Sequence, residues 1–553
     1  MRFFELIKNS GLGRLGKLMS SHGTVITPEL MPVYNPNIPL ISTKELIEDF
    51  DIKILITNAY IINRTETLKA NAEQGIHELI DFPRTIMLDS GAYQAWMYKK
   101  ELQVSNKEII EFQEILNPDI ATILDVFTDT DDYQIAKNGV VETIKRAKQC
   151  IEIRDNSDGG TMWAAPIQGG KFFDLIDFCA KRLSELDFNY HPIGTLAPAL
   201  MNYNYRPVLQ AIATAKINMN VSRPLHAFSI GHPMFFALSV LFGSDLFDSS
   251  SYALYAKGER YITPTATLDF NDLQEFPCSC PTCLKYSPEE IRELEKQEKI
   301  KLLAKHNLHA CLDEMKRIRE AIRQDSLWEL VQSRVRAHPN LLDAYIHSLL
   351  KFKRNFEIND PITKKTAFFY VGKDSLFRPE VLRHSKRLLT NYSPPKFEGK
   401  RIKILILLPD ILTRPIESSD FQEWMDKINL AIENNPHLKI DDIHVCIISP
   451  VFGIIPSEIY DTYPLSQYLY PNIFLEDLKV HVGKSIIDYL RKFHDHYQSI
   501  LILYPKAQIE NYEIVNYPLL KQSIINEKLS KSFDLRTVET IGSLQKMIEK
   551  YHA

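Results

Sequence analysis

Residues 85–91 have the sequence Thr-Ile-Met-Leu-Asp-Ser-Gly, a short apolar run that ends in polar residues and glycine. This pattern is typical of a buried β-strand followed by a turn. Seven similar runs lie in the first 250 residues, at 26–33, 52–58, 120–126, 161–168, 190–194, 225–231 and 245–251. Between them lie segments with apolar residues at helical spacing, such as 106–116 and 172–186. Eight alternating strand and helix units predict an α/β fold with parallel strands, namely a closed (β/α)8 TIM barrel.

An open, doubly wound sheet is the alternative to the barrel, because the count rests on short runs. We expect the barrel to occupy residues 1–275. The charge-rich, helical stretch 276–350 is expected to form an inserted zinc-binding subdomain, and its helix is expected to start at 287–290 (Ser-Pro-Glu-Glu).

A second, smaller α/β domain is predicted at the C-terminal end, over residues 401–553. Residues 351–400 contain four prolines and are expected to connect it to the preceding helices. The expected strands are 401–410, 444–456 and 499–505, and the expected helices are 418–435, 482–497 and 542–553.

The amino-acid composition limits the classes of protein to which this chain can belong. Apolar residues make up 45% of the chain and charged residues 24%, as in ordinary soluble globular proteins. The net charge of −5 gives no nucleic-acid signal, so any nucleic-acid contact requires a local basic patch. No apolar run reaches the ~18 residues of a membrane span, and the N-terminus lacks the pattern of a signal peptide. We therefore expect a cytoplasmic protein with no membrane partner.

The cysteines point to a metal site. There are seven, an odd number, and Cys278, Cys280 and Cys283 lie within six residues of one another. This crowding favours a reduced compartment and metal binding over disulfides. Three thiolates and the imidazole of His306 would complete the tetrahedral shell of a structural zinc ion. His309 and Cys311 lie on the same predicted helix and are alternatives for the fourth ligand, and free thiols are the alternative to a metal.

Polar residues follow several predicted strands, where a barrel places its catalytic groups. Asp89, Asp125, Gln168 and Asp248 all occupy such positions. Carboxylates that converge on one mouth repel each other, so one is expected to hold a raised pKa and act as a general acid or base. A second carboxylate could be the nucleophile at an anomeric carbon. The alternative for any single aspartate is that it caps the following helix.

The segment after Asp89 offers more than a helix cap. Gly91 permits a sharp turn, and Ser90, Tyr93 and Gln94 bring hydrogen-bonding groups and an aromatic ring to the predicted mouth. Tyr93 and Phe228 could hold a flat base between them, with core packing as the alternative for both rings.

One familiar glycine motif lacks the strand and the helix that should flank it. Gly11, Gly13 and Gly16 match the G-x-G-x-x-G pattern of dinucleotide-binding proteins. No strand is predicted before them, and the residues that follow favour a hairpin over a helix. We therefore exclude dinucleotide binding.

Taken together, these motifs resemble the tRNA-guanine transglycosylases, most closely the archaeal enzymes. The similar blocks span residues 5–365 in order, and the most specific are FDSSSYALYAK and CSCPTC, beginning at Phe247 and Cys278. The resemblance implies a barrel with an inserted zinc subdomain, Zn²⁺ as the cofactor with His306 as its fourth ligand, and a homodimer. It implies tRNA and a 7-deazaguanine base as partners.

The resemblance also implies roles for the site residues. Asp248 would be the nucleophile that attacks C1′ of the target ribose, and Asp89 would be the general acid/base. Base recognition would fall to Asp125, Gln168, Ser90 and Gly194, between walls formed by Tyr93 and Phe228. In the archaeal family the incoming base is 7-cyano-7-deazaguanine and the target is guanine 15 of the D-arm, in archaeosine biosynthesis.

The sequence departs from the family pattern in two ways. Thr195 stands where most relatives carry a second glycine, which bears on substrate preference. We find no PUA domain, so a separate PUA-domain protein could supply tRNA binding. Residues 448–468 instead resemble a domain of archaeosine synthase, whose active elements are replaced at 408–420. An archaeosine-synthase-like enzyme and a non-catalytic tRNA-binding subunit of a hetero-oligomer are therefore the alternatives.

Overall fold

The computed structural model describes residues 3–93, 104–154, 160–395, 401–410, 419–471, 476–504, 520, 522–524 and 533–552. The chain divides into two compact units, Met1–Pro361 and Ile362–Ala553. Each unit is considered by itself below.

Eight parallel strands form the centre of the first unit. Each of the eight predicted apolar runs contains one of them: β4 (Glu29–Pro32), β5 (Ile54–Asn58), β6 (Thr85–Asp89), β7 (Ile120–Thr122), β8 (Met162–Ala164), β9 (His191–Ile193), β10 (Leu225–Ala227) and β11 (Leu246–Ser249). They form two four-stranded sheets, β5-β6-β7-β8 and β4-β11-β10-β9. The predicted α/β fold with parallel strands is thus confirmed.

The two sheets are joined at both edges and share one core. Parallel bridges connect Val33 with Ile56 between β4 and β5, and two further bridges connect the β8 and β9 regions. Alternate side chains from both sheets, among them Met31, Ile56, Met87 and Leu246, pack into a single buried cluster. The side chains on one face of these strands therefore meet across a common interior.

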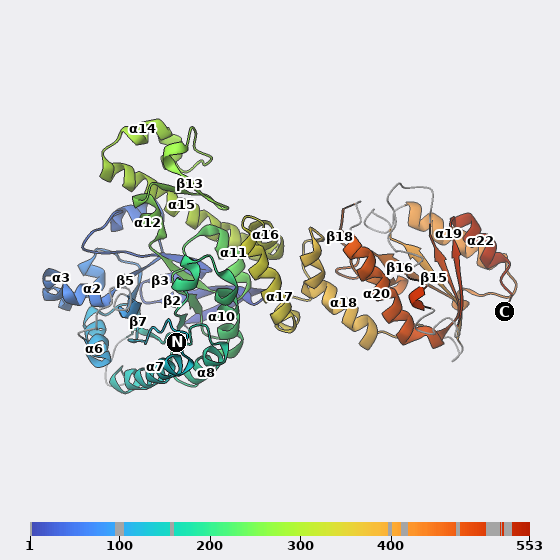
Figure 1. Ribbon diagram of the computed structural model, residues 1–553, viewed down its shortest axis with the longest axis horizontal. Coiled ribbons are helices and arrows are strands. Elements are labelled where there is room, and N and C mark those ends of the chain that lie inside the picture. Colours follow the sequence, from blue (N-terminus) through green and yellow to red (C-terminus); the bar gives the residue numbers. More distant parts are fainter. Residues whose placement is uncertain are drawn as a thin grey trace. The chain divides into compact units, whose positions relative to one another are not determined.

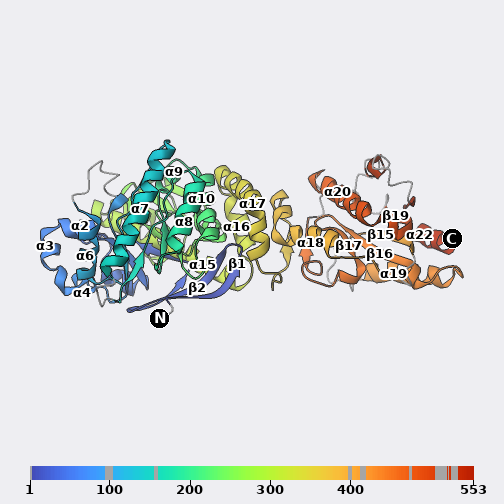
Figure 2. The same ribbon diagram turned by 90° about the horizontal axis from the view of Figure 1, so that it is seen from below.

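Helices cover the outer face of these strands, as the alternating pattern predicted. Figures 1 and 2 show α7, α8 and α10 side by side there. The covering helices include α2 (Ala59–Arg64), α6 (Asn106–Leu116), α7 (Tyr133–Arg154), α8 (Phe173–Ser184), α10 (Tyr205–Asn218), α11 (Pro233–Leu241) and α12 (Ser251–Lys257). In α6, Ser105 and Glu108 form a capping box, which satisfies backbone donors at the helix start.

An antiparallel sheet precedes the parallel strands, formed by β1 (Phe4–Ser10), β2 (Gly13–Ser20) and β3 (Gly23–Thr27). The G-x-G-x-x-G motif covers the β1–β2 turn and β2. Contrary to expectation, a strand (β1) does precede it, but it is followed by a strand and not by the helix that a dinucleotide-binding motif requires. Its glycines serve packing: a Cβ at Gly13 would lie 2.0 Å from the Val240 carbonyl oxygen.

The predicted helical stretch 276–350 holds α13 (Pro281–Lys285), α14 (Pro288–Glu293), α15 (Lys296–Arg323), α16 (Leu327–Val335) and α17 (Pro339–Asn359). The predicted helix start is confirmed by the capping box of Ser287 and Glu290. Helix α15 packs against α12 and α11, and α17 packs against α10, so these helices belong to the first unit. In the part of the chain that the structure describes, no helix has the length and apolar character needed to cross a membrane.

The second unit is built on a five-stranded sheet. Its order is β17-β16-β15-β19-β20, with bounds Gly453–Pro456, Ile443–Ser449, Ile402–Pro409, Tyr497–Leu503 and Asp534–Val538. One face packs against α19 (Ser419–Glu433) and α22 (Ile541–Glu549), and the other packs against α20 (Glu476–Phe493).

The second unit differs from expectation in two places. The sequence predicts one strand over 444–456, but this run forms the antiparallel pair β16 and β17; the turn between them spans residues 450–452, and Gly453, with φ +75°, begins β17. Residues 351–400, the expected connector, contain the end of α17 and the helix α18 (Pro379–Thr390). Most of the 408–420 segment lies outside the described residues.

Candidate active site

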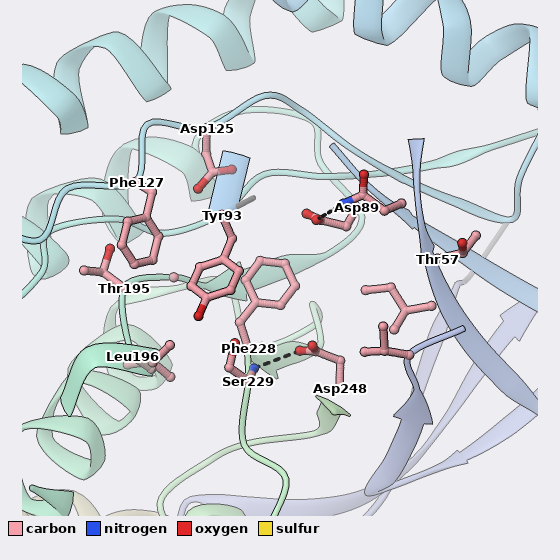
Figure 3. Close-up of a pocket in the computed structure, with 15 residues that line it drawn as sticks. Thr57, Asp89, Tyr93, Asp125, Phe127, Thr195, Leu196, Phe228, Ser229 and Asp248 are labelled. Atoms are coloured by element: carbon pink, nitrogen blue, oxygen red, sulfur yellow. Dashed lines mark hydrogen bonds between the residues drawn. The ribbon is translucent and has the colours of Figure 1, made fainter. Parts of the chain in front are cut away.

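A pocket lies at the carboxyl ends of the parallel strands (Figure 3). Asp89 and Asp248 both line it, and their carboxylates are directed into the same space. The other lining residues are Val33, Ile56, Thr57, Asn58, Tyr93, Asp125, Phe127, Gly194, Thr195, Leu196, Ala197, Phe228 and Ser229. Residues far apart in sequence meet here because parallel strands present their carboxyl ends at one edge.

Asp89 is the last residue of β6 and faces Asn58, the last residue of β5. The Asn58 amide Nδ2 donates a hydrogen bond of 2.7 Å to Asp89 Oδ2. Gly91 makes the turn possible: its φ is +98°, and a Cβ there would lie 2.5 Å from Cβ of Tyr60. Burial, reinforced by the nearby carboxylates of Asp125 and Asp248, raises the pKa of Asp89 to about 7. Asp89 can therefore hold or release a proton near neutral pH.

Asp248 lies on β11 and is held by groups from β10 and the loop after it. His226 Nε2 lies 2.9 Å from Asp248 Oδ1, and the Ser229 backbone N–H donates to the same oxygen at 3.0 Å. Within the described residues, the other oxygen, Oδ2, has no hydrogen bond. This carboxylate is thus oriented through one oxygen, which leaves the second available for attack on a bound substrate.

The serines after Asp248 fix the neighbouring loop. Ser249 Oγ and Ser251 Oγ lie 2.7 Å apart, and Ser251 Oγ donates to the Gly231 carbonyl oxygen at 2.7 Å. A Cβ at Gly231 would lie 1.8 Å from Ser249 Oγ, so only glycine fits there. This network ties β11 to the loop that carries Phe228 and Ser229.

Asp125, Gln168 and Thr195 form a chain of hydrogen bonds. Gln168 Nε2 donates to Asp125 Oδ2, and the Thr195 hydroxyl donates to Gln168 Oε1 at 2.6 Å. Burial raises the pKa of Asp125 to about 6, although the hydrogen bond from Gln168 opposes the shift. This chain fixes the orientation of the Asp125 carboxyl group at the pocket wall.

Threonine at position 195, the departure from the family pattern noted above, affects both the backbone and the pocket. Thr195 has φ +58°, a left-handed conformation that glycine adopts at lower cost than threonine. The preceding Gly194 is required, because a Cβ there would lie 2.3 Å from Gln168 Nε2. The Gly194 N–H already donates to the Ile167 carbonyl oxygen at 3.0 Å. Gly194 thus makes room for Gln168, while the Thr195 side chain occupies pocket space.

The pocket walls are aromatic. Tyr93 and Phe228 line it as predicted, and Phe127 joins them, with its ring edge-on to Tyr93 at a centroid distance of 5.5 Å. Two other predicted residues do not line the pocket: Ser90 is fully buried and Gln168 is 1% exposed, behind Asp125. Gln94 lies outside the described residues.

Sequence reasoning missed four groups at the site: Asn58, Phe127, His226 and Ser229. Asn58 could have been found, since it is a polar residue at the end of a predicted strand, like Asp89. Phe127 follows Asp125 by two residues and could have been found as an aromatic residue near the same mouth. His226 and Ser229 carry no comparable signal, because only the pairing of β10 with β11 brings them to Asp248.

Replacing Asp89 with asparagine is expected to stabilise the protein at high pH. With a pKa near 7 when folded and about 3.9 when unfolded, Asp89 favours the folded state at acidic pH. This contribution is lost as the pH rises from about 4 to 7. Asparagine avoids the loss and can still accept the Asn58 hydrogen bond. We expect Asp89→Asn to exceed wild type by about 1–2 kcal/mol at pH 8, with no gain near pH 4.5.

Denaturant unfolding at both pH values measures this difference. Asp177→Asn, at a partly exposed position on α8 paired with Lys181, is the matched control and should show no pH-dependent gain. An Asp89→Asn gain of equal size at both pH values would contradict the raised pKa of Asp89.

A second cluster of functional side chains lies at Cys278, Cys280, Cys283 and His306, whose ligand atoms all lie within 4.8 Å of one another. His306 Nδ1 lies 3.5 Å from Cys280 Sγ and 3.4 Å from Cys283 Sγ. Three sulfurs and one imidazole nitrogen at this spacing fit a tetrahedral metal ion. The alternatives for the fourth ligand point elsewhere: His309 packs on Phe50, and Cys311 contacts the Gly231 carbonyl.

The surroundings of this cluster favour metal binding. His306 Nε2 lies 2.9 Å from the Ile262 carbonyl oxygen, which requires an N–H at Nε2 and leaves the Nδ1 lone pair facing the sulfurs. The Tyr261 ring stacks on His306 at 3.6 Å, and its hydroxyl lies 3.2 Å from Cys283 Sγ. This hydroxyl can donate to a thiolate and stabilise it.

Comparison with known proteins agrees with the site. The family described as queuine tRNA-ribosyltransferase matches residues 9–340. The tRNA-guanine(15) transglycosylases of Methanocaldococcus jannaschii and Methanococcus aeolicus are both 40% identical to this chain; the alignments cover 88% and 89% of this chain and 71% and 72% of the relatives. That of Methanosphaera stadtmanae is 36% identical, over 94% of this chain and 75% of the relative. The chain therefore belongs to the tRNA-guanine transglycosylase family of enzymes.

Proposed function

We propose that this enzyme exchanges guanine at position 15 of tRNA for 7-cyano-7-deazaguanine, as a step in archaeosine biosynthesis. The observation that carries the proposal is the meeting of Asp89 and Asp248 at one pocket with aromatic walls. The names of the relatives support guanine 15 as the target. Aromatic side chains suit a flat base, because every base offers a face for stacking.

The two aspartates divide the chemistry between them. The free oxygen of Asp248 attacks C1′ of the target ribose, and the bond from C1′ to guanine breaks as the ester bond forms. Asp89 donates its proton to the departing guanine and then accepts one from the incoming base, whose nitrogen displaces Asp248. Two displacements at C1′ retain its configuration, as in retaining glycosidases. A pKa of about 7 suits Asp89 to both roles.

Base recognition is assigned to the remaining polar groups. The Asp125 carboxyl, fixed by Gln168, faces the pocket and can accept hydrogen bonds from the base edge. Tyr93 and Phe228 form the walls. Ser90 lies behind the pocket wall, so its predicted contact with the base becomes an indirect one, whereas Gly194 lines the pocket and can contact the base.

The surrounding architecture follows from the same proposal. The bridges at both sheet edges support a closed (β/α)8 barrel, with the strand ends gathered at one mouth. Cys278, Cys280, Cys283 and His306 would hold Zn²⁺, which stabilises the fold around them through a closed shell that excludes substrate. A homodimer and a separate PUA-domain partner stay predictions; sedimentation of the purified chain tests the first.

The function is tested by incubating the purified protein with tRNA and either labelled guanine or labelled 7-cyano-7-deazaguanine. We expect incorporation of label, and its loss in a tRNA whose residue 15 is adenine. No incorporation of either base would overturn the proposal and favour a non-catalytic tRNA-binding subunit. Chemical change of a base already present in tRNA would favour an archaeosine-synthase-like enzyme.

Replacing Thr195 with glycine is expected to strengthen binding of the incoming base. The Thr195 hydroxyl donates a hydrogen bond to Gln168 Oε1, which takes this acceptor away from the base, and the Thr195 side chain fills pocket space. Glycine removes both effects and relieves the left-handed strain. We expect KM for the base to fall about 2- to 10-fold, the equivalent of one hydrogen bond, with kcat little changed. Thr195→Ser keeps the hydroxyl and is the control; an unchanged or higher KM in Thr195→Gly would contradict this role.

A further inference from the structure

A second group of metal-ligating side chains lies away from the pocket. His22 sits in the turn between β2 and β3, His77 lies on α4 (Ile76–Leu79), and Asp119 directly precedes β7. Asp119 Oδ2 accepts a hydrogen bond from the backbone N–H of Ile86 at the start of β6. Asp89 ends the same strand, so this group lies at the amino ends of the parallel strands, opposite the catalytic mouth.

The three ligand atoms are spaced as metal binding requires. His22 Nδ1 lies 2.9 Å from Asp119 Oδ1, and His77 Nε2 lies 3.3 Å from Asp119 Oδ2. All three ligand atoms lie within 4.8 Å of one another. Ligands about 2.0–2.1 Å from a tetrahedral ion lie about 3.3 Å apart, which matches this spacing. The Asp119 side chain is fully buried, whereas that of His22 is 36% exposed, so an ion here would have access to solvent.

The tautomer of His77 creates the need for a cation. Its Nδ1 lies 3.0 Å from the Phe82 carbonyl oxygen, which can only accept, so Nδ1 must carry hydrogen. In a neutral ring the buried Nε2 then turns a lone pair toward the Asp119 carboxylate, and the structure gives this atom no hydrogen bond within the described residues. The Nε2 lone pair and the carboxylate oxygen, 3.3 Å apart, repel each other unless a positive charge lies between them.

The alternative source of that charge is a proton on His77 Nε2, and a measurement of metal binding distinguishes the two. The His22 and His77 rings stack with centroids 3.6 Å apart, so both imidazoles lie together beside the Asp119 carboxylate. A single divalent ion would accept a lone pair from each ring. The carboxylate is ready for this role, because backbone N–H groups of His22 and Ile86 each bond one of its oxygens and fix its orientation.

We propose that His22, His77 and Asp119 form a second metal site, which binds a divalent transition-metal ion such as zinc. Two imidazoles and one carboxylate suit zinc-like ions, and the fourth position is open to water at the exposed His22 side. The ion would join the β2–β3 turn to α4 and to the start of β7. Since the site lies opposite the catalytic mouth, its role is to stabilise the amino ends of the strands.

Cobalt binding tests this proposal without reference to activity. The full chain, without a histidine tag, is freed of metal, equilibrated with Co²⁺ and dialysed, and cobalt per chain is measured together with the absorption spectrum. We expect two cobalt ions per wild-type chain. One shows sulfur-to-cobalt charge transfer from the cysteine cluster, and the other shows only the weaker bands of nitrogen and oxygen ligands.

The variant His22→Gln separates the two sites. It leaves the backbone contacts of Asp119 in place and replaces a half-exposed ring in a turn, so folding is retained. It should bind one cobalt ion, with the sulfur charge-transfer bands unchanged. His347→Gln, at an exposed histidine on α17, is the matched control and should bind two. One cobalt ion in the wild type, or two in His22→Gln, would overturn the proposal.

Discussion

The variant Asp248→Asn is expected to lose base exchange by at least ~10⁴-fold, the scale seen when a catalytic nucleophile is removed. Asparagine has nearly the same shape and can still accept the hydrogen bond from the Ser229 backbone N–H. It lacks the second carboxylate oxygen that would attack C1′, so no ester can form. Wild type incubated with tRNA should give a covalent protein–tRNA band on a denaturing gel, and Asp248→Asn should give none.

The matched control for this experiment is Asp343→Asn. Asp343 is an exposed aspartate in the same unit that pairs with Arg206, outside the pocket. It should retain both exchange activity and the covalent band. A covalent band of full strength from Asp248→Asn would assign the nucleophile to another residue, with Asp89 the next candidate at the pocket.

The variant Cys280→Ser is expected to lose one equivalent of zinc and much of the stability of the first unit. Its sulfur is buried and lies 3.5 Å from both Cys283 Sγ and His306 Nδ1, so serine would leave a ligand position poorly filled. Metal binding contributes directly to folding at such sites. We expect the Tm to fall by roughly 5–10 °C, equivalent to a few kcal/mol, and chelation of the wild type to have a similar effect.

Metal analysis and thermal unfolding check this prediction. Cys311→Ser is the control, because Cys311 lies on the same helix α15 as His306 but contacts the Gly231 carbonyl oxygen. A serine hydroxyl can make that contact, so zinc content and Tm should stay close to wild type. Zinc retention in Cys280→Ser would show that these residues do not hold the ion.

The two aspartates also illustrate how function and stability compete within one pocket. Asp89 has a raised pKa chiefly because it is buried, and also because the carboxylates of Asp125 and Asp248 lie nearby. The same environment makes the charged form costly to the fold, which is why Asp89→Asn is expected to stabilise the protein while removing the proposed acid/base group. The stability prediction and the catalytic proposal therefore rest on one measurable quantity, the pKa of Asp89.

Much of the fold was predictable because its signals are local. Each of the eight apolar runs contains a strand, the start of α14 follows from Ser287 and Glu290, and the three cysteines lie within one short segment. The hairpin of β16 and β17 was missed because Gly453 interrupts a run that is apolar on both sides. Local patterns of hydrophobicity do not distinguish one long strand from two short strands joined by a tight turn.

By itself, then, the sequence determined the eight parallel strands, the cysteine cluster and the two aspartates on which the proposed chemistry depends. Only the tertiary structure decided which partners each of these groups has. Asn58 bonds Asp89, Thr195 is linked to Asp125 through Gln168, and His226 lies beside Asp248. In each case the side chains come from strand ends that are neighbours in space but are separated in the sequence by whole helices. Such contacts depend on strand order and register, which no short stretch of sequence contains.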